Sequence, residues 1–73
     1  MGVTNSDVID TVTRMEQKLS KVDSDDIKTL FRLYLELAPQ FETDLGDSMR
    51  DVAIAKASAL MLIQAAAHAR GTL

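Results

Sequence analysis

The residues of this sequence that could take part in chemistry lie in four places. Ser48 and Ser58 are candidate nucleophiles, and His68 is the only histidine. Three aspartates and a serine occupy the positions from Asp23 to Asp26. The sequence contains no cysteine, which excludes disulfides, thiolate metal sites and a cysteine nucleophile. A catalytic or metal site would therefore depend on serine, histidine and carboxylates.

None of these places has the surroundings that its chemistry requires. The serines lack the glycine-flanked elbow of hydrolase nucleophiles, and one imidazole cannot build a zinc site. A calcium loop that starts at Asp23 needs glycine at its sixth position and glutamate at its twelfth, where this sequence has Lys28 and Tyr34. We therefore predict no catalytic residue, no metal and no cofactor, and we expect a protein that is not an enzyme.

One short motif resembles a known modification site. In the stretch DLGDSM, residues 44–49, Asp47 directly precedes Ser48 and the large apolar Met49 follows it, after a Leu-Gly pair. This arrangement resembles the loop on which acyl carrier proteins present their modified serine, and those proteins are also small, acidic, cysteine-poor and helical. The resemblance implies a phosphopantetheine arm on Ser48.

The remainder of the chain departs from the carrier pattern. Only 25 residues follow Ser48, and they predict a single alanine-rich helix where carrier proteins have two or three helices. A second interpretation of the motif is structural. Gly46 weakens a helix, and Ser48 with Asp51 three residues later can cap a helix that begins again. We favour this capping interpretation.

Size and charge limit the function further. A single domain of 73 residues buries only ~60% of its unfolded surface, so it is marginally stable as a monomer. Without disulfides or metal, association with itself or with a partner is the remaining means of stabilisation. The net charge is −3 and no basic stripe exists, which argues against nucleic-acid binding. The apolar run at residues 57–67 is shorter than the ~20 residues that span a bilayer. We expect a cytoplasmic protein that does not bind membranes.

Composition predicts an all-α fold. The sequence has one proline, three glycines and many strong helix formers, and it lacks the alternation of strands. Caps and apolar spacing predict helices over residues 6–21, 25–37 and 39–70 in a single domain, residues 1–73. We favour a tight corner at Pro39, because proline in a helix interior costs ~3 kcal/mol. The result is a small three-helix bundle.

A kinked helical hairpin stays open as the alternative, because one heptad phase continues through Pro39. The a and d positions of this phase, of which only one is polar, are Ile27, Phe31, Tyr34, Ala38, Phe41, Leu45, Ser48, Val52, Ala55, Ala59, Leu62, Ala66 and Ala69. The end of the last helix is unambiguous, since His68 and Arg70 suit a helix C-terminus and Gly71 suits the residue after it.

The alanine-rich last helix is the strongest functional indication. Its large apolar residues point in every direction around the axis, and its small residues recur at spacings of four, which lets helices approach closely. We predict an interface formed by Leu60, Met61 and Ile63, with a second patch formed by Leu33, Leu37 and Phe41. The expected function is a non-catalytic regulator, adaptor or chaperone of bacterial or phage type. It would act through helix–helix contact, as a homo-oligomer or with a partner helix. A self-assembling structural subunit is the alternative.

Overall fold

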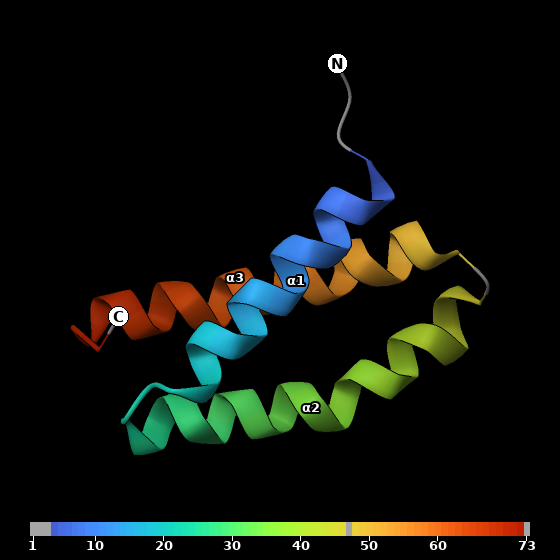
Figure 1. The fold of residues 1–73 in the computed structure, drawn as a ribbon. Coiled ribbons are helices and arrows are strands. Elements are labelled where there is room, and N and C mark those ends of the chain that lie inside the picture. The colour runs from blue at the N-terminus through green and yellow to red at the C-terminus, as the bar shows by residue number, and fades with distance from the viewer. Residues whose placement is uncertain (1–3, 47, 73) are drawn as a thin grey trace.

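The computed structural model describes residues 4–46 and 48–72 and contains three α-helices (Figure 1). They are α1 (Asn5–Ser20), α2 (Asp25–Leu45) and α3 (Met49–Ala69). No strand occurs in these two ranges. The predicted all-α class and the three-helix bundle are therefore confirmed.

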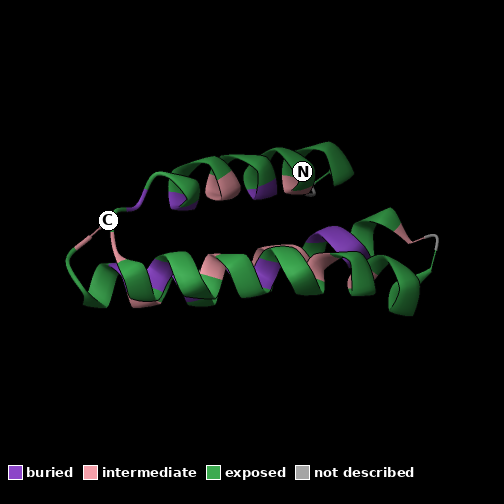
Figure 2. Ribbon diagram, turned by 90° about the horizontal axis from the view of Figure 1, so that it is seen from below, coloured by how far each residue is buried: buried purple, intermediate pink, exposed green. Residues whose placement is uncertain are grey.

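The helices form two layers (Figure 2). Helices α2 and α3 run antiparallel as a hairpin, and α1 lies across one side of this hairpin, mainly over α3. At its N-terminal half α1 diverges from α2, as Figure 1 shows. We call the side of the hairpin that α1 covers the α1 face and the opposite side the open face. No described helix packs on the open face.

Local capping explains where α1 begins, and the buried residues show which of its sides is packed. Thr4 is the N-cap: its hydroxyl accepts from the Asp7 amide at 3.1 Å, and the Asp7 carboxylate accepts from the Thr4 amide at 3.1 Å. This reciprocal capping box satisfies two amides that the helix leaves unbonded. Val12 and Leu19, which are seven residues apart and so lie on the same side of α1, are buried. They mark the side of α1 that packs on the hairpin.

The predicted corner at Pro39 is wrong, because α2 continues through this residue to Leu45. The predicted boundaries 25–37 and 39–70 are wrong with it. Tyr34, before the proline, is buried, Ala38 packs against the core, and Phe41, after the proline, is half-buried. Proline removes one helical hydrogen bond. Because α2 continues through Pro39 as one helix, Tyr34 and Phe41, which are seven residues apart, lie on the same side of it.

The break falls instead between Gly46 and Ser48. Gly46 ends α2 with φ of 63°, a region that residues with a Cβ rarely adopt. Ser48 is the N-cap of α3, and its hydroxyl accepts from the Asp51 amide at 3.3 Å. The predicted capping pair is confirmed. The predicted C-terminus is also confirmed, with Gly71 at φ of 70° directly after the last turn.

The core lies between α3 and the other two helices. Its three fully buried large side chains, Leu19, Ile27 and Leu60, come from α1, α2 and α3 respectively. In α3 the buried residues are Val52, Ala53, Leu60, Ile63 and Ala67. The uninterrupted heptad phase predicts Val52, but Leu62, which it also predicts, is 75% exposed, and its neighbour Ile63 is buried instead. After the break between α2 and α3 the core positions follow a different phase, so the prediction of one continuous phase is wrong in the C-terminal part of α3.

Candidate interaction surface

The solvent-facing surface of α3 carries no charge over about four helical turns. Between Asp51 and His68 the sequence has one ionisable residue, Lys56. Its Nζ lies 3.6 Å from Glu42 Oε1 of α2, and 24% of its side chain is exposed. Lys56 therefore points towards α2 and leaves the outer side of α3 apolar. Exposed helices of soluble proteins normally carry charged residues on the outer side, so this surface is typical of an interface.

A leucine stripe continues this apolar surface onto α2. Leu30, Leu33 and Leu37 follow one another at intervals of three and four residues, which places them on one side of the helix. Between 39% and 51% of each residue is exposed. They lie beside the buried positions Ile27 and Tyr34 without joining the core. Three neighbouring leucines are thus partly open to water.

Two ion pairs define how α2 and α3 align. Asp26 Oδ2 lies 2.7 Å from Arg70 Nη1 at one end of the hairpin, and Glu42 pairs with Lys56 nearer the loop. In an antiparallel pair, the numbers of facing residues have a nearly constant sum, here 96 to 98. Leu62 is therefore level with the middle of the leucine stripe on α2.

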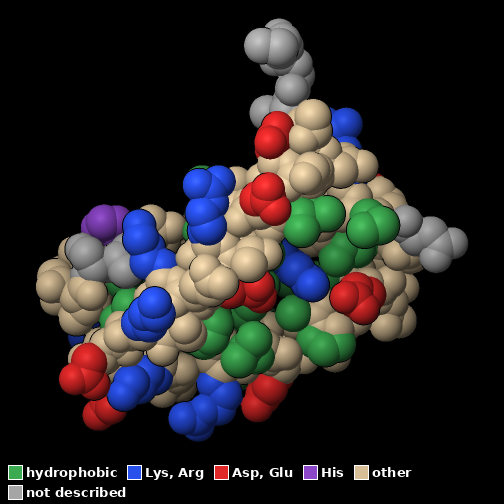
Figure 3. Space-filling model, viewed as in Figure 1, with side chains coloured by type: hydrophobic (Ala, Val, Ile, Leu, Met, Phe, Trp, Pro, Cys, Tyr) green, Lys and Arg blue, Asp and Glu red, His purple; other side chains and the backbone are tan. Residues whose placement is uncertain are grey.

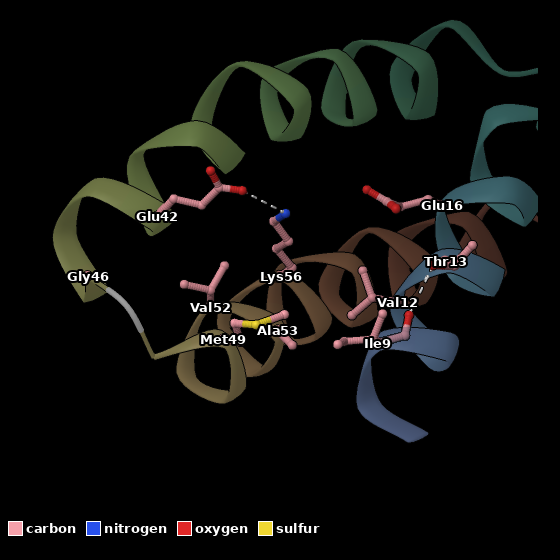
Figure 4. A pocket seen from close by; sticks show the side chains of 10 residues that line it. All are labelled: Ile9, Val12, Thr13, Glu16, Glu42, Gly46, Met49, Val52, Ala53 and Lys56. Carbon is pink, nitrogen blue, oxygen red and sulfur yellow. Dashed lines mark hydrogen bonds and ion pairs between the residues drawn. The ribbon is translucent and has the colours of Figure 1, made fainter. Parts of the chain in front are cut away.

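Helical geometry places Leu33 and Leu62 on the open face. Glu42 and Ala53 line a hollow on the α1 face (Figure 4). Leu33 lies nine residues before Glu42, and Leu62 lies nine residues after Ala53. At ~100° per residue, nine residues correspond to half a turn beyond two full turns. Both leucines therefore point away from α1.

The open face combines these features into one apolar patch. Its large side chains belong to both helices of the hairpin, and half-buried alanines lie between them. We define the patch as Leu30, Leu33, Leu37, Ala55, Ala59, Leu62 and Ala66. Leu62 is 75% exposed, the highest value among the exposed large hydrophobic residues of the chain's described part.

The six residues predicted for the interface divide into three groups. Leu33 and Leu37 lie on the open face, and Met61 is 62% exposed on the outer side of α3, about 100° around the helix from Leu62. Phe41 is half-buried on α2. Two further predicted residues need correction.

Leu60 and Ile63 are 0% and 7% exposed, so they belong to the core of the chain itself and cannot meet a partner. The prediction placed them in the interface because the rotation of α3 was unknown. Leu62 is the surface residue that the prediction missed. The Gly46 break was the available signal, since a new helix can begin in a new heptad phase.

The remaining candidate residues have structural surroundings. Ser48 caps α3, while Asp47, which the carrier motif includes, lies outside the described residues. A phosphopantetheine arm on Ser48 stays a prediction. His68 is exposed in the last turn of α3. In the acidic cluster, Asp23 Oδ1 pairs with Lys28 Nζ at 3.2 Å.

By length and composition alone, α3 meets the criterion for a helix that can cross a membrane, and it is the only described helix to do so. A core helix of a soluble protein meets the same criterion. In the structure α3 packs against both α1 and α2. Comparisons with protein-family models, with curated proteins and with solved structures found no match to this chain.

Proposed function

We propose that this protein is a non-catalytic interaction module that self-associates through its open face. The observation that carries the proposal is the apolar patch there, to which α2 and α3 both contribute leucines and in which no charged side chain lies. A small helical protein of this type acts by presenting helices to other proteins, as regulators, adaptors and chaperones do.

The exposed area favours a second copy of the chain as the occupant. The chain exposes 5119 Å², whereas a folded monomer of 8.0 kDa typically exposes about 4,450 Å². This excess of about 670 Å² is a total for the whole chain, and it is of the size that a second copy can cover, since each partner contributes ~800 Å² to a standard interface. The half-buried alanines in the patch let the two hairpins approach closely.

Charge favours a dimer in which the two hairpins run in opposite directions. Residues 42–51, at the loop end, include four acidic residues and one basic residue, a net charge of −3. At the other end, the acidic and basic residues of 25–32 balance, and Arg70 adds one positive charge. An antiparallel copy separates the two acidic loop ends and places each beside the less acidic end of its partner.

Symmetry separates this proposal from the alternative of a self-assembling structural subunit. When the same patch meets the same patch, a two-fold axis relates the copies and the assembly closes at two chains. A subunit that polymerises needs two different contact surfaces. The outer edge of α3 around Met61 and Ile54 is the available second surface, and its use would produce larger species.

Sedimentation over a range of protein concentrations tests the proposal, with a matched pair of variants. Leu35 and Leu37 are each 51% exposed on α2. Leu35 is seven residues from Glu42, so it lies on the side of α2 that Glu42 occupies, whereas Leu37 lies on the open face. We expect twice the chain mass for the wild type and for Leu35→Glu, and the mass of one chain for Leu37→Glu.

Three outcomes would contradict the proposal. A monomeric wild type at high micromolar concentration would leave the open face without its partner copy. Equal effects of Leu35→Glu and Leu37→Glu would show that the open face is not the contact. A monomer that sediments with lipid vesicles would assign the apolar patch to a membrane surface instead.

A further inference from the structure

A hollow on the α1 face lies apart from the open face, where α1 diverges from the loop end of the hairpin (Figure 3). Its volume is about 710 Å³, which lies within the ~300–1,000 Å³ of small-molecule sites. Helix α1 forms one wall, α3 forms the floor, and the C-terminal part of α2 forms the other wall. The hollow is therefore bounded by all three helices.

The hollow has a charged end and an apolar end (Figure 4). Glu42, Lys56 and Glu16 lie on one side of it, one from each helix. The other side is formed by apolar side chains of α1 and of α3: Ile9, Val12, Met49, Val52 and Ala53. This separation is complementary to a molecule with a polar head and an apolar body.

Lys56 occupies a position in α3 that otherwise belongs to the core. Ala53, Leu60, Ile63 and Ala67, at the neighbouring positions of the same seam, are all buried and apolar. A partly buried ammonium group is costly unless it is paired. Its ion pair with Glu42 supplies that partner, so the positive charge of Lys56 is already compensated within the chain.

Glu16 is the carboxylate that remains for a ligand. The Tyr34 hydroxyl donates a hydrogen bond to Glu16 Oε2 at 2.8 Å, which holds the carboxylate at the edge of the hollow. The other oxygen, Oε1, can accept from a ligand. With Glu42 and Lys56 opposite in sign, the three groups carry a net charge of −1. This charge attracts a cation and repels an anion.

We propose that the hollow binds small amphiphilic amines, with the ammonium group at Glu16 and the alkyl or aryl body against Ile9 and Met49. Thr13 supplies no competing donor, because its hydroxyl donates to the Ile9 carbonyl at 3.0 Å. The chain as a whole is also acidic, which assists the approach of a cation. This site does not depend on the proposed dimer.

Three ligands with the same alkyl chain test the sign of the head group. Octylammonium, octanol and octanoate, each below its micelle-forming concentration, are titrated into the full chain by calorimetry. We expect octylammonium to bind at one site per chain and to bind more tightly than octanol, and octanoate to bind most weakly. Equal or tighter binding of octanoate would overturn the proposal.

Variants locate the site. Glu16→Gln keeps the shape and the acceptor for Tyr34 but removes the charge, and we expect about tenfold weaker octylammonium binding, since hydrogen bonds to charged groups are stronger than neutral ones. Glu36→Gln, which changes an exposed carboxylate outside the hollow, should leave binding unchanged. Met49→Ala, at a residue 68% exposed, should weaken all three ligands without unfolding the chain.

Two results would show that the amine does not occupy the hollow: unchanged binding to Glu16→Gln, or loss of binding in Glu36→Gln to the same extent. The monomeric variant Leu37→Glu separates this site from the proposed function. Octylammonium should bind Leu37→Glu as it binds the wild type. Loss of binding there would assign the amine to the open face and overturn the proposal, while the dimer could still exist.

Discussion

Two leucines that are two positions apart on α3 should respond very differently to the same substitution. Leu60 is fully buried in the core cluster that also contains Leu19 and Ile27, and Leu62 is 75% exposed. Replacing a buried leucine by alanine removes its transfer free energy and leaves a cavity, at a cost of ~2–5 kcal/mol. Replacing an exposed leucine changes monomer stability by less than ~0.5 kcal/mol.

The expected loss in Leu60→Ala is a large part of the total. A chain of 73 residues has a free energy of unfolding of about 4–11 kcal/mol, at ~0.05–0.15 kcal/mol per residue. A loss of ~2–5 kcal/mol removes at least about a fifth of that stability, and at the lower end of the stability range the largest loss removes all of it. The core offers little compensation, because the surrounding residues come from three separate helices and cannot all move towards the cavity.

Urea unfolding followed by circular dichroism at low and high protein concentration measures both effects. Leu60→Ala should lower the free energy of unfolding equally at both concentrations. Leu62→Ala should match the wild type at low concentration and lose stability only at high concentration, where the dimer contributes. The reasoning would be refuted if Leu62→Ala were as costly as Leu60→Ala in the monomer, because α3 would then be rotated about its axis relative to the structure.

The other predictions concern the helix ends and the single tyrosine. Pro39→Ala restores a backbone donor inside α2, so it should raise the free energy of unfolding by up to ~3 kcal/mol and with it the midpoint of urea unfolding. A lower midpoint would show that the packing of α2 requires the proline. Gly46→Ala should lower the free energy of unfolding by ~1–3 kcal/mol in the same assay, because alanine is strained at a φ of 63°. No atom lies within 4 Å of an added Cβ, so this backbone strain is the whole effect. An unchanged midpoint would mean that the loop conformation is not required. Burial, together with the hydrogen bond to Glu16, raises the pKa of the Tyr34 phenol above its ordinary value of 10.0. The unfolded chain therefore loses this proton first, and the free energy of unfolding should fall as the pH rises above ~10. Absorbance at 295 nm reports the ionisation of Tyr34 alone, because the sequence has one tyrosine and no tryptophan. In the folded chain this ionisation should occur above pH ~10, and titration at the ordinary value would contradict the burial.

The helix ends were predictable because they depend on residues close in sequence. Thr4 with Asp7 and Ser48 with Asp51 form caps whose partners are three residues apart. Gly71 follows the last turn of α3 at positive φ, where glycine has no Cβ to clash. Such features require no knowledge of the other helices, so the number of helices and most of their ends could be inferred from the sequence.

The middle of the chain was mispredicted because two local preferences opposed a tertiary one. Proline disfavours a helix interior, and a single glycine is tolerated there, so a corner at Pro39 was preferred to a break at Gly46. In the structure α2 continues through Pro39, with Tyr34 buried and Ala38 packed against the core. The candidate surface depended on the same tertiary information. The sequence grouped Leu33, Leu37, Leu60 and Ile63 in one predicted interface, and only the structure shows that Leu33 and Leu37 are exposed whereas Leu60 and Ile63 are buried.

The sequence by itself determined the all-α class, the caps and the uncharged surface of α3, because each depends on composition or on neighbours within one helical turn. Only the tertiary structure decided the rotation of α3 about its axis, and with it which leucine is buried and which face stays open. The physical reason is that α3 is apolar on nearly all sides. Its own pattern does not distinguish one side from another, and the simultaneous packing against α1 and α2 selects the orientation.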